Sequence, residues 1–184
     1  MRVLLMDLDV SRRRRPFPNL ALMKLAAWWR SRGAEVIFNF PLERHDLAYG
    51  SCVFTWNASR PRPAVAFEAL GGTGIDLDGN LHQLIEHIMP DYSLYPGARF
   101  SLGFTSRGCP RRCPWCVVPL KEGDIRPHSL VAEFLDPSLR DILLLDDNIL
   151  AAPNWPATWE DLRAEVGRGH RVDFNQGLDI RFLD

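Results

Sequence analysis

The sequence lacks any apolar run long enough to cross a membrane, for which about 18 consecutive residues are needed. Its net charge is only −1 at pH 7, so no overall electric field attracts nucleic acid or an anionic membrane. Lysine is scarce, because only Lys24 and Lys121 are lysines among 22 basic residues. An apolar content of 46% and a charged content of 24% are ordinary values. We therefore expect a soluble globular protein without a transmembrane helix.

An export signal is the one alternative that the start of the chain raises. SRRRRPF precedes the apolar LALMKLAAWW, an order that superficially resembles a twin-arginine leader. However, an apolar strand precedes the arginines, Lys24 interrupts the apolar run, and no small-residue cleavage site follows. We reject the leader and expect a cytoplasmic protein.

Three of the four cysteines lie in one short loop, at Cys109, Cys113 and Cys116, with the spacing C-x3-C-x2-C. Glycine and proline residues stop any regular element from forming through this loop: Gly108, Pro110 and Pro114. We expect the three thiols to converge on one point. Three thiolates can hold a metal, and iron–sulfur clusters and zinc are the common choices.

The loop resembles the cluster loop of the radical S-adenosylmethionine (radical SAM) superfamily, C-x3-C-x-aromatic-C. Trp115 fills the aromatic position, and the apolar segment 101–105 leads into the loop as a strand. The resemblance implies a [4Fe–4S] cluster on the three cysteines, with one iron left open to the amino and carboxylate groups of SAM. It also implies reductive cleavage of SAM to a 5′-deoxyadenosyl radical, chemistry that belongs to the cofactor, with Trp115 near the cofactor.

Other interpretations of the cysteines remain open. His128 could complete a Cys3His structural zinc site, which would make the chain a non-catalytic metal-binding module. A disulfide would leave an odd thiol in the loop. Cys52 lies in the apolar run YGSCVFTW and is most simply a buried core cysteine.

Strand and helix patterns alternate through residues 1–97. We expect strands at 2–10, 34–40 and 49–56, and helices at 20–32, 64–70 and 81–89. Asn19 can cap the first helix, and the glycines of GGTG at 71–74 form a turn after the second rather than a phosphate loop. A strand, a helix and a strand in succession predict a parallel, Rossmann-like domain.

The resemblance extends to this first domain, because many radical SAM proteins carry a related N-terminal cobalamin-binding module. The chain lacks the D-x-H-x-x-G motif of lower-His cobalamin binding and reads DLDVSRRRRPF instead. We therefore expect a degenerate relative of that module. The run Arg12 to Arg15 is a solvated loop in the simplest interpretation. A transfer RNA contact is the alternative, as in family members that modify transfer RNA.

Residues 98–184 again alternate, with strands expected at 101–105, 141–145 and 171–175 and helices at 129–135 and 155–166. Ser129 is the possible cap of the first of these helices. Polar residues follow two of the strands: Asp146, Asp147 and Asn148 after one, and Asn175, Gln176 and Asp179 after the next. The carboxyl ends of parallel strands are where α/β sheets bind ligands. In another interpretation Asp146 and Asp147 only cap the following loop.

In the radical SAM family, a Gly-Gly-Glu-like motif after the second strand holds the amino group of SAM. The corresponding position here reads LDDN, so the resemblance implies that Asp147 or Asn148 accepts those hydrogen bonds. NQGLDIR resembles family segments that reach SAM or substrate, which makes Asn175, Gln176 and Arg181 further candidates.

A full radical SAM core is a partial (βα)6 barrel, whereas residues 98–184 have room for three strands. We expect the first half of such a barrel, in a fragment or in half of a split protein. A second chain would complete the barrel. The chain alone would bind SAM weakly or not at all and would not turn over a substrate. The residues that select the substrate are not identified by these patterns.

Overall fold

Two parallel β-sheets form the framework of the computed structural model, which describes residues 1–10 and 17–183. The chain divides into two units, Met1–Ala98 and Arg99–Asp184, and each is described by itself. The run Arg12 to Arg15 lies outside the described residues. None of the helices in the described part of the chain has the length and apolar character needed to span a membrane.

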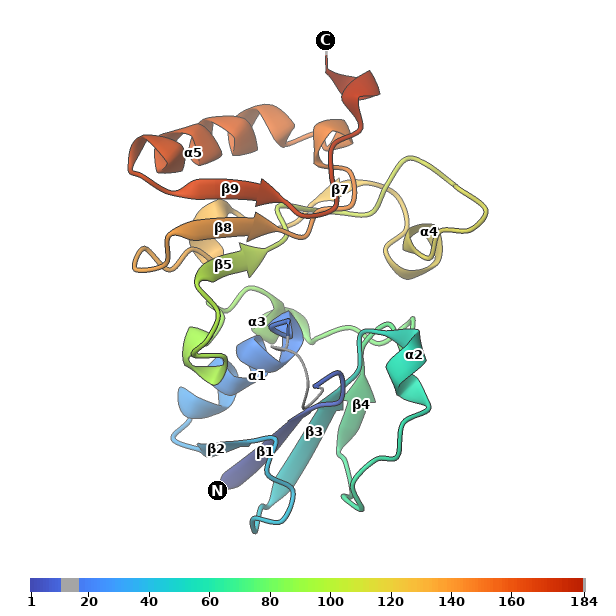
Figure 1. Cartoon of the computed structure of the whole chain (residues 1–184), viewed down its shortest axis with the longest axis vertical. Helices are drawn as coiled ribbons and strands as arrows, with labels where there is room; N and C mark the ends of the chain where they lie inside the picture. Colours follow the sequence, from blue (N-terminus) through green and yellow to red (C-terminus); the bar gives the residue numbers. More distant parts are fainter. Residues whose placement is uncertain (11–16, 184) are drawn as a thin grey trace. The chain divides into compact units, whose positions relative to one another are not determined.

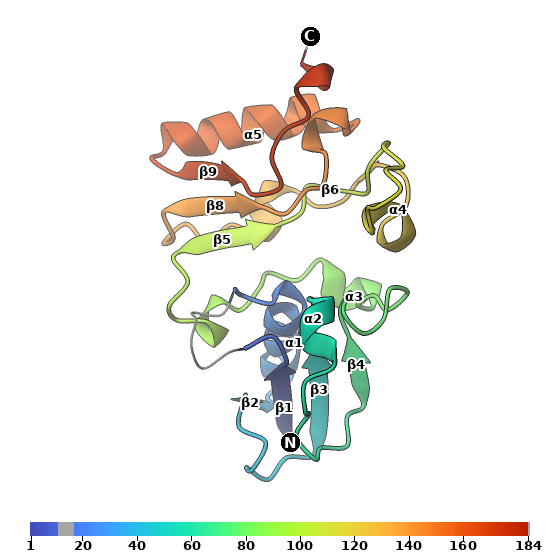
Figure 2. The ribbon, with the colours of Figure 1, turned by 45° about the vertical axis from the view of Figure 1, so that its right-hand side comes forward.

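The first unit is built on a four-stranded, fully parallel sheet in the order β2-β1-β3-β4 (Figures 1 and 2). Its elements are β1 (Arg2–Asp7), α1 (Leu20–Arg30), β2 (Glu35–Phe38), β3 (Leu47–Ser51), α2 (Thr55–Ala58), β4 (Ala69–Gly71), α3 (Gln83–Glu86) and η1 (Tyr92–Leu94). The predicted strand–helix–strand unit and the parallel sheet are confirmed. Because β2 and β3 lie on opposite sides of β1, the strand order reverses between β1 and β3. The topological switch point of the sheet therefore lies at the carboxyl ends of these two strands.

Helix α1 begins where the sequence predicts. Asn19 Oδ1 accepts a hydrogen bond from the Leu22 amide at 3.2 Å and so caps the helix. The helix buries Leu22, Met23 and Ala26. A separate apolar cluster of the unit joins Leu4, Met6, Ile37 and Ala48, with Val65 and Phe67 packed against it.

Two predicted elements of this unit are wrong. The strand expected at 49–56 ends at Ser51, because the Asp9 carboxylate accepts the amides of Val53 (2.5 Å) and Phe54 (3.3 Å) and turns the chain into α2. The helix expected at 64–70 is extended chain followed by strand β4, which pairs with β3. Tertiary pairing and burial outweigh helix propensity in this segment.

The glycines after β4 form a tight turn against another loop. Gly72 has φ +92°, and a Cβ added to it would lie 2.3 Å from the carbonyl oxygen of Cys52. The Gly74 amide donates to that same oxygen at 2.9 Å. These glycines therefore allow close backbone approach, as the turn interpretation predicts.

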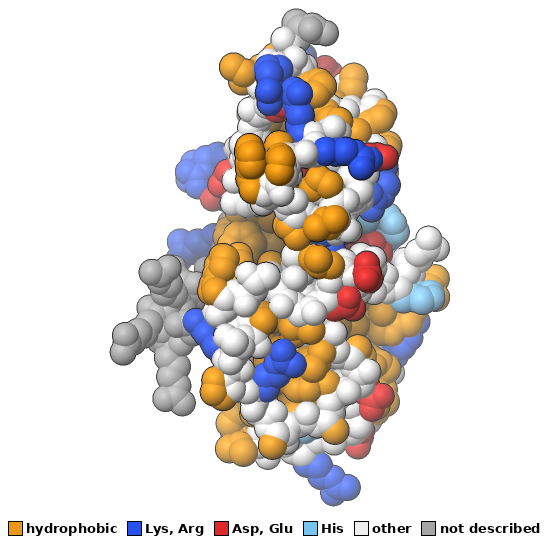
Figure 3. Space-filling view, turned by 90° about the vertical axis from the view of Figure 1, so that its right-hand side faces the viewer, with side chains coloured by type: hydrophobic (Ala, Val, Ile, Leu, Met, Phe, Trp, Pro, Cys, Tyr) orange, Lys and Arg blue, Asp and Glu red, His pale blue; other side chains and the backbone are white. Residues whose placement is uncertain are grey.

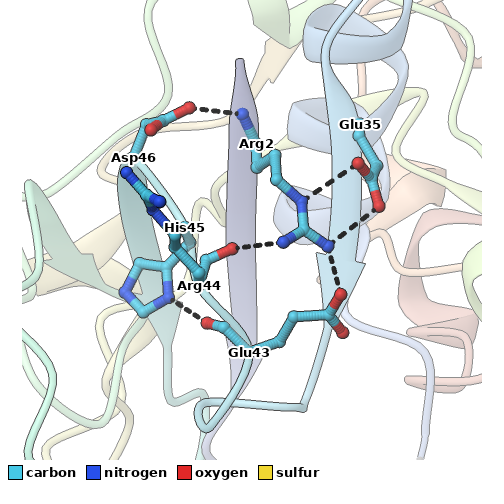
Figure 4. Close-up of polar contacts among 6 residues, drawn as sticks. All are labelled: Arg2, Glu35, Glu43, Arg44, His45 and Asp46. Atoms are coloured by element: carbon cyan, nitrogen blue, oxygen red, sulfur yellow. Dashed lines mark hydrogen bonds and ion pairs between the residues drawn. The ribbon is translucent and has the colours of Figure 1, made fainter.

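The amino-terminal edge of the sheet is held by Arg2 (Figure 4). Its guanidinium bonds both oxygens of Glu35 on β2, at 3.0 and 3.1 Å, and contacts Glu43. It also donates to the Arg44 carbonyl at 2.8 Å, and the Arg2 amide donates to Asp46 at 2.7 Å. This network closes the edge opposite to the one where α/β sheets bind ligands.

The second unit is built on a three-stranded parallel sheet in the order β5-β8-β9, with a separate antiparallel pair β6·β7. Its elements are β5 (Phe100–Gly103), β6 (Ser106–Arg107), α4 (Val118–Lys121), β7 (Arg126–Pro127), η2 (Val131–Glu133), β8 (Asp141–Leu144), η3 (Ile149–Ala151), α5 (Trp155–Gly167), β9 (Arg171–Phe174) and η4 (Ile180–Phe182). The α/β class is thus confirmed in this unit also. Its core gathers side chains from β8, η2, η3 and α5: Ile142, Leu144, Val131, Phe134, Ile149, Leu150 and Leu162.

The helix expected at 129–135 is shorter than predicted. It is a single 3₁₀ turn, Val131–Glu133, and Ser129 does not cap it. Instead, the amide of Leu130 donates to the Glu133 carboxylate at 2.8 Å. Phe134, directly after this turn, packs so close to β5 that a Cβ on Gly103 would lie 2.3 Å from its ring.

Candidate metal centre

The cysteine loop leaves and rejoins the second unit through the β6·β7 pair, which aligns Ser106 with Pro127 and Arg107 with Arg126. Within the loop, the amide of Cys109 donates to the carbonyl of Gly123 at 3.3 Å. The short strands therefore tie the two ends of the loop together.

Gly108 has a backbone that other residues rarely adopt. Its φ is +83°, and an added Cβ would lie 2.4 Å from the carbonyl oxygen of Asp124. Its amide also bonds the Asp147 carboxylate. Only glycine fits this close approach of the loop to its own return strand.

The three loop cysteines are free thiols, each partly exposed. Sγ of Cys109 accepts from the Arg111 amide at 3.4 Å and from Asn148 Nδ2 at 3.5 Å, and the Cys116 amide donates to the Cys113 carbonyl at 3.0 Å. Within residues 1–10 and 17–183, no three His, Cys, Asp or Glu side chains are gathered as a metal site. The expectation that the three thiols converge on one point stays a prediction. Without a metal, no strong interaction draws three thiols together, and metal binding commonly organises such a loop.

Trp115 and His128 are the two other residues that were predicted near the metal. Trp115 is 88% exposed, so its indole lies on the outside of the loop. The His128 amide donates to the Thr105 carbonyl at 2.9 Å, and its ring lies edge-on to Phe104 with centroids 6.4 Å apart. His128 is thus at the base of the loop, beside β7.

Asp146 follows β8 and holds the chain that leads from β5 into the loop. Its carboxylate is 3% exposed. It accepts the amides and hydroxyls of both Thr105 and Ser106, at 2.5 to 3.0 Å. This carboxylate therefore has a structural task, which differs from the predicted capping of the following loop.

Asp147 and Asn148, the next two residues, each keep a buried oxygen without a partner. Asp147 Oδ2 and Asn148 Oδ1 have no hydrogen-bond partner in the described part of the chain. Leaving such acceptors unsatisfied costs roughly 1–3 kcal/mol each. Asn148 is 4% exposed and binds Cys109 through its other side-chain atom, so these acceptors lie next to the cysteine loop.

The electrostatic setting of Asp147 is unusual for a carboxylate. Burial, and after it the carboxylate of Glu122, raise its pKa to about 6, although the guanidinium of Arg107 opposes both. Arg107 Nη1 bonds Glu122 at 3.1 Å and stacks over the Phe104 ring. A cation bound beside Asp147 would stabilise the ionised carboxylate and so lower its pKa.

The residues after β9 divide into two sets. Asn175 and Gln176 are exposed. Asp179 binds both the loop and the C-terminal turn: it accepts Arg111 Nε at 3.2 Å and both Nε and Nη2 of Arg181, at 2.6 and 2.9 Å. These guanidiniums lower the pKa of the Asp179 carboxyl, that of Arg181 most. Arg181 is thus engaged by Asp179, a contact that sequence reasoning missed.

Cys52, by contrast, is fully buried in the first unit, with its thiol 3.4 Å from Asp9 Oδ1. It is a buried core cysteine, as predicted, and burial raises its pKa to about 11. Arg107, Glu122 and Arg111 were also missed, because nothing in their sequence context distinguishes them from ordinary surface charges.

Comparison of the chain with models of protein families, with curated proteins and with solved structures found no match.

Proposed function

We propose that the second unit binds a [4Fe–4S] cluster through Cys109, Cys113 and Cys116 and acts as a radical SAM centre. The observation that carries the proposal is the pair of unsatisfied acceptors, Asp147 Oδ2 and Asn148 Oδ1, beside a loop of three free thiols. An ammonium group has three donors and a positive charge, which match those acceptors and the raised pKa of Asp147.

The donor set fits the group. Three thiolates are soft ligands suited to iron–sulfur clusters, and the loop joins the sheet at the carboxyl ends of parallel strands, where α/β folds place their ligands. A bound cluster would supply the electron for reductive cleavage of SAM to the 5′-deoxyadenosyl radical. The three strands β5, β8 and β9 lie in sequence order, which is how a (βα)6 barrel begins.

The side chains around the loop have separate tasks in this proposal. Asp147 and Asn148 accept the ammonium of SAM, while Asp146 fixes the entry to the loop through Thr105 and Ser106. Further contacts to SAM or to the substrate would come from four residues: Trp115, Asn175, Gln176 and Arg181.

In this proposal the first unit is a Rossmann-like relative of cobalamin-binding modules that lacks the histidine that binds cobalt from the lower face of cobalamin. In this proposal the protein acts in the cytoplasm. Transfer RNA remains the candidate raised by the Arg12–Arg15 run, and a second protein chain is a further candidate partner.

Metal reconstitution tests the proposal. The purified chain would be incubated anaerobically with iron and sulfide, and separately with zinc, and its metal content measured. We expect a brown protein with about four irons per chain. Cys109→Ala, Cys113→Ala and Cys116→Ala should each lose most of the iron, whereas Cys52→Ala, the same change at a buried thiol in the other unit, should keep it.

Two results would reject the proposal. Full iron in Cys113→Ala would show that the loop thiols are not the ligands. A colourless protein that binds one zinc, and loses it in His128→Ala, would instead support the Cys3His structural site.

A further inference from the structure

Asn148 contacts the cysteine loop directly. Its side chain is buried, and Nδ2 donates to Sγ of Cys109 at 3.5 Å. Hydrogen bonds to ligand sulfurs are among the factors that set the reduction potential of an iron–sulfur cluster. The same side chain can thus serve two purposes, because its amide nitrogen faces a thiol and its oxygen, which has no hydrogen-bond partner among residues 1–10 and 17–183, can accept another donor.

A second polar group joins the loop to the segment after β9. Asp179 accepts hydrogen bonds from both Arg111 and Arg181. Arg111 lies between Cys109 and Cys113 in the sequence. Two guanidiniums around one carboxylate leave a net positive charge beside the loop.

We propose that Asn148 and the Arg111–Asp179–Arg181 group raise the reduction potential of the cluster held by the loop. This inference rests on the proposed function. Reduction adds one negative charge, so an N–H donor on a sulfur and a nearby net cation both favour the reduced state. Asn148 has the larger effect, because it is buried, whereas the Arg181 side chain is 69% exposed and is screened by solvent and salt.

The test is a redox titration of the reconstituted full chain, with the midpoint potential as the readout. Asn148→Leu keeps a similar size but removes the N–H donor, and Arg181→Gln removes the charge. We expect both potentials to become more negative, with the larger shift in Asn148→Leu. Arg181→Lys keeps the charge and should retain most of the wild-type potential.

Two matched controls separate this effect from a general one. Asn154 donates to the Thr105 carbonyl and to Thr158, so Asn154→Leu should leave the potential unchanged. Arg112 lies in the same loop but pairs with Asp124 and is 77% exposed. Arg112→Gln removes the same charge as Arg181→Gln and should also leave the potential unchanged.

Unchanged potentials in Asn148→Leu and Arg181→Gln, in a protein loaded with iron, would overturn this inference and leave the proposed function standing. A wild-type chain that binds no iron would overturn the proposed function and the inference together. If Asn148→Leu fails to hold iron, the midpoint potential of Arg181→Gln becomes the deciding measurement, because Arg181 is exposed. A wild-type potential in Arg181→Gln would then overturn the inference.

Discussion

At the scale of single residues, the two adjacent carboxylates after β8 have opposite roles. Asp146 is satisfied by four donors from Thr105 and Ser106. Asp147 keeps a buried oxygen without a partner in the described part of the chain. A residue kept in a position that costs stability is a candidate for function, because binding a ligand can recover that cost.

The pH dependence of stability separates the two roles. In Asp147 the folded-state pKa is raised to about 6, above an unfolded value of about 4. Ionisation therefore destabilises the fold, and the loss grows as the pH rises from about 4 to 6. Asp147→Asn should raise the free energy of unfolding at about pH 8 by about 1–2 kcal/mol, after allowance for solvent screening, and should change it little at about pH 4.

Asp146→Asn is the matched control for this measurement. It places an NH₂ group against donors and should lower the free energy of unfolding by about 2–4 kcal/mol at either pH. Both variants would be compared with the wild type by denaturant unfolding of the iron-free protein. Loss of stability in Asp147→Asn at about pH 8 would show that this carboxylate is structural.

At the scale of elements, the cysteine loop depends on its closure by β6 and β7. Gly108→Ala would put a Cβ 2.4 Å from a backbone oxygen at a φ of +83°. We expect a loss of stability of more than about 2 kcal/mol and reduced iron uptake. Gly123→Ala has a similar φ, +73°, but meets no atom within 4 Å, so it should cost only about 1 kcal/mol.

Thermal unfolding and iron analysis would check the pair of glycine variants. Equal effects in both would mean that backbone strain alone matters, and that the close approach at Gly108 does not fix the loop.

Regular elements with a clear apolar period were predictable. Strand β8 and helix α5 begin at Asp141 and Trp155, as predicted. The segment 64–70 was mistaken for a helix, although Val65 and Phe67 alternate as in extended chain, because its residues also favour helices and only pairing with β3 decides.

The candidate site was predictable only in part. The cysteine spacing and the polar residues after β8 could be identified from order along the chain, because parallel strands end at one edge. The bond from Asn148 to Cys109 and the role of Asp179 could not, because they depend on contacts between residues 39 and 68 positions apart. The different roles of Asp146 and Asp147 could not be predicted either, because they depend on which of the two side chains contacts the segment that leads into the loop.

At the scale of the whole molecule, strand β9 pairs with β8 and, in the described part of the chain, with no other strand. Leu178, Ile180 and Leu183, which follow it, are exposed. Figure 3 shows hydrophobic side chains at the surface on the face that it presents. An open strand edge beside apolar side chains favours association.

Sedimentation velocity should therefore show self-association that increases with protein concentration. A protein that remains monomeric over the whole concentration range would argue against association of two copies of this chain through the β9 edge.

The effect of SAM on the reduced cluster tests the central claim most directly. The reconstituted, reduced protein would be examined by electron paramagnetic resonance, alone and with SAM in excess. 5′-Methylthioadenosine is the control, because it keeps the nucleoside but lacks the amino and carboxylate groups. We predict that SAM changes the spectrum, that the control does not, and that the change is weaker in Asp147→Ala. Identical spectra with and without SAM would contradict the account.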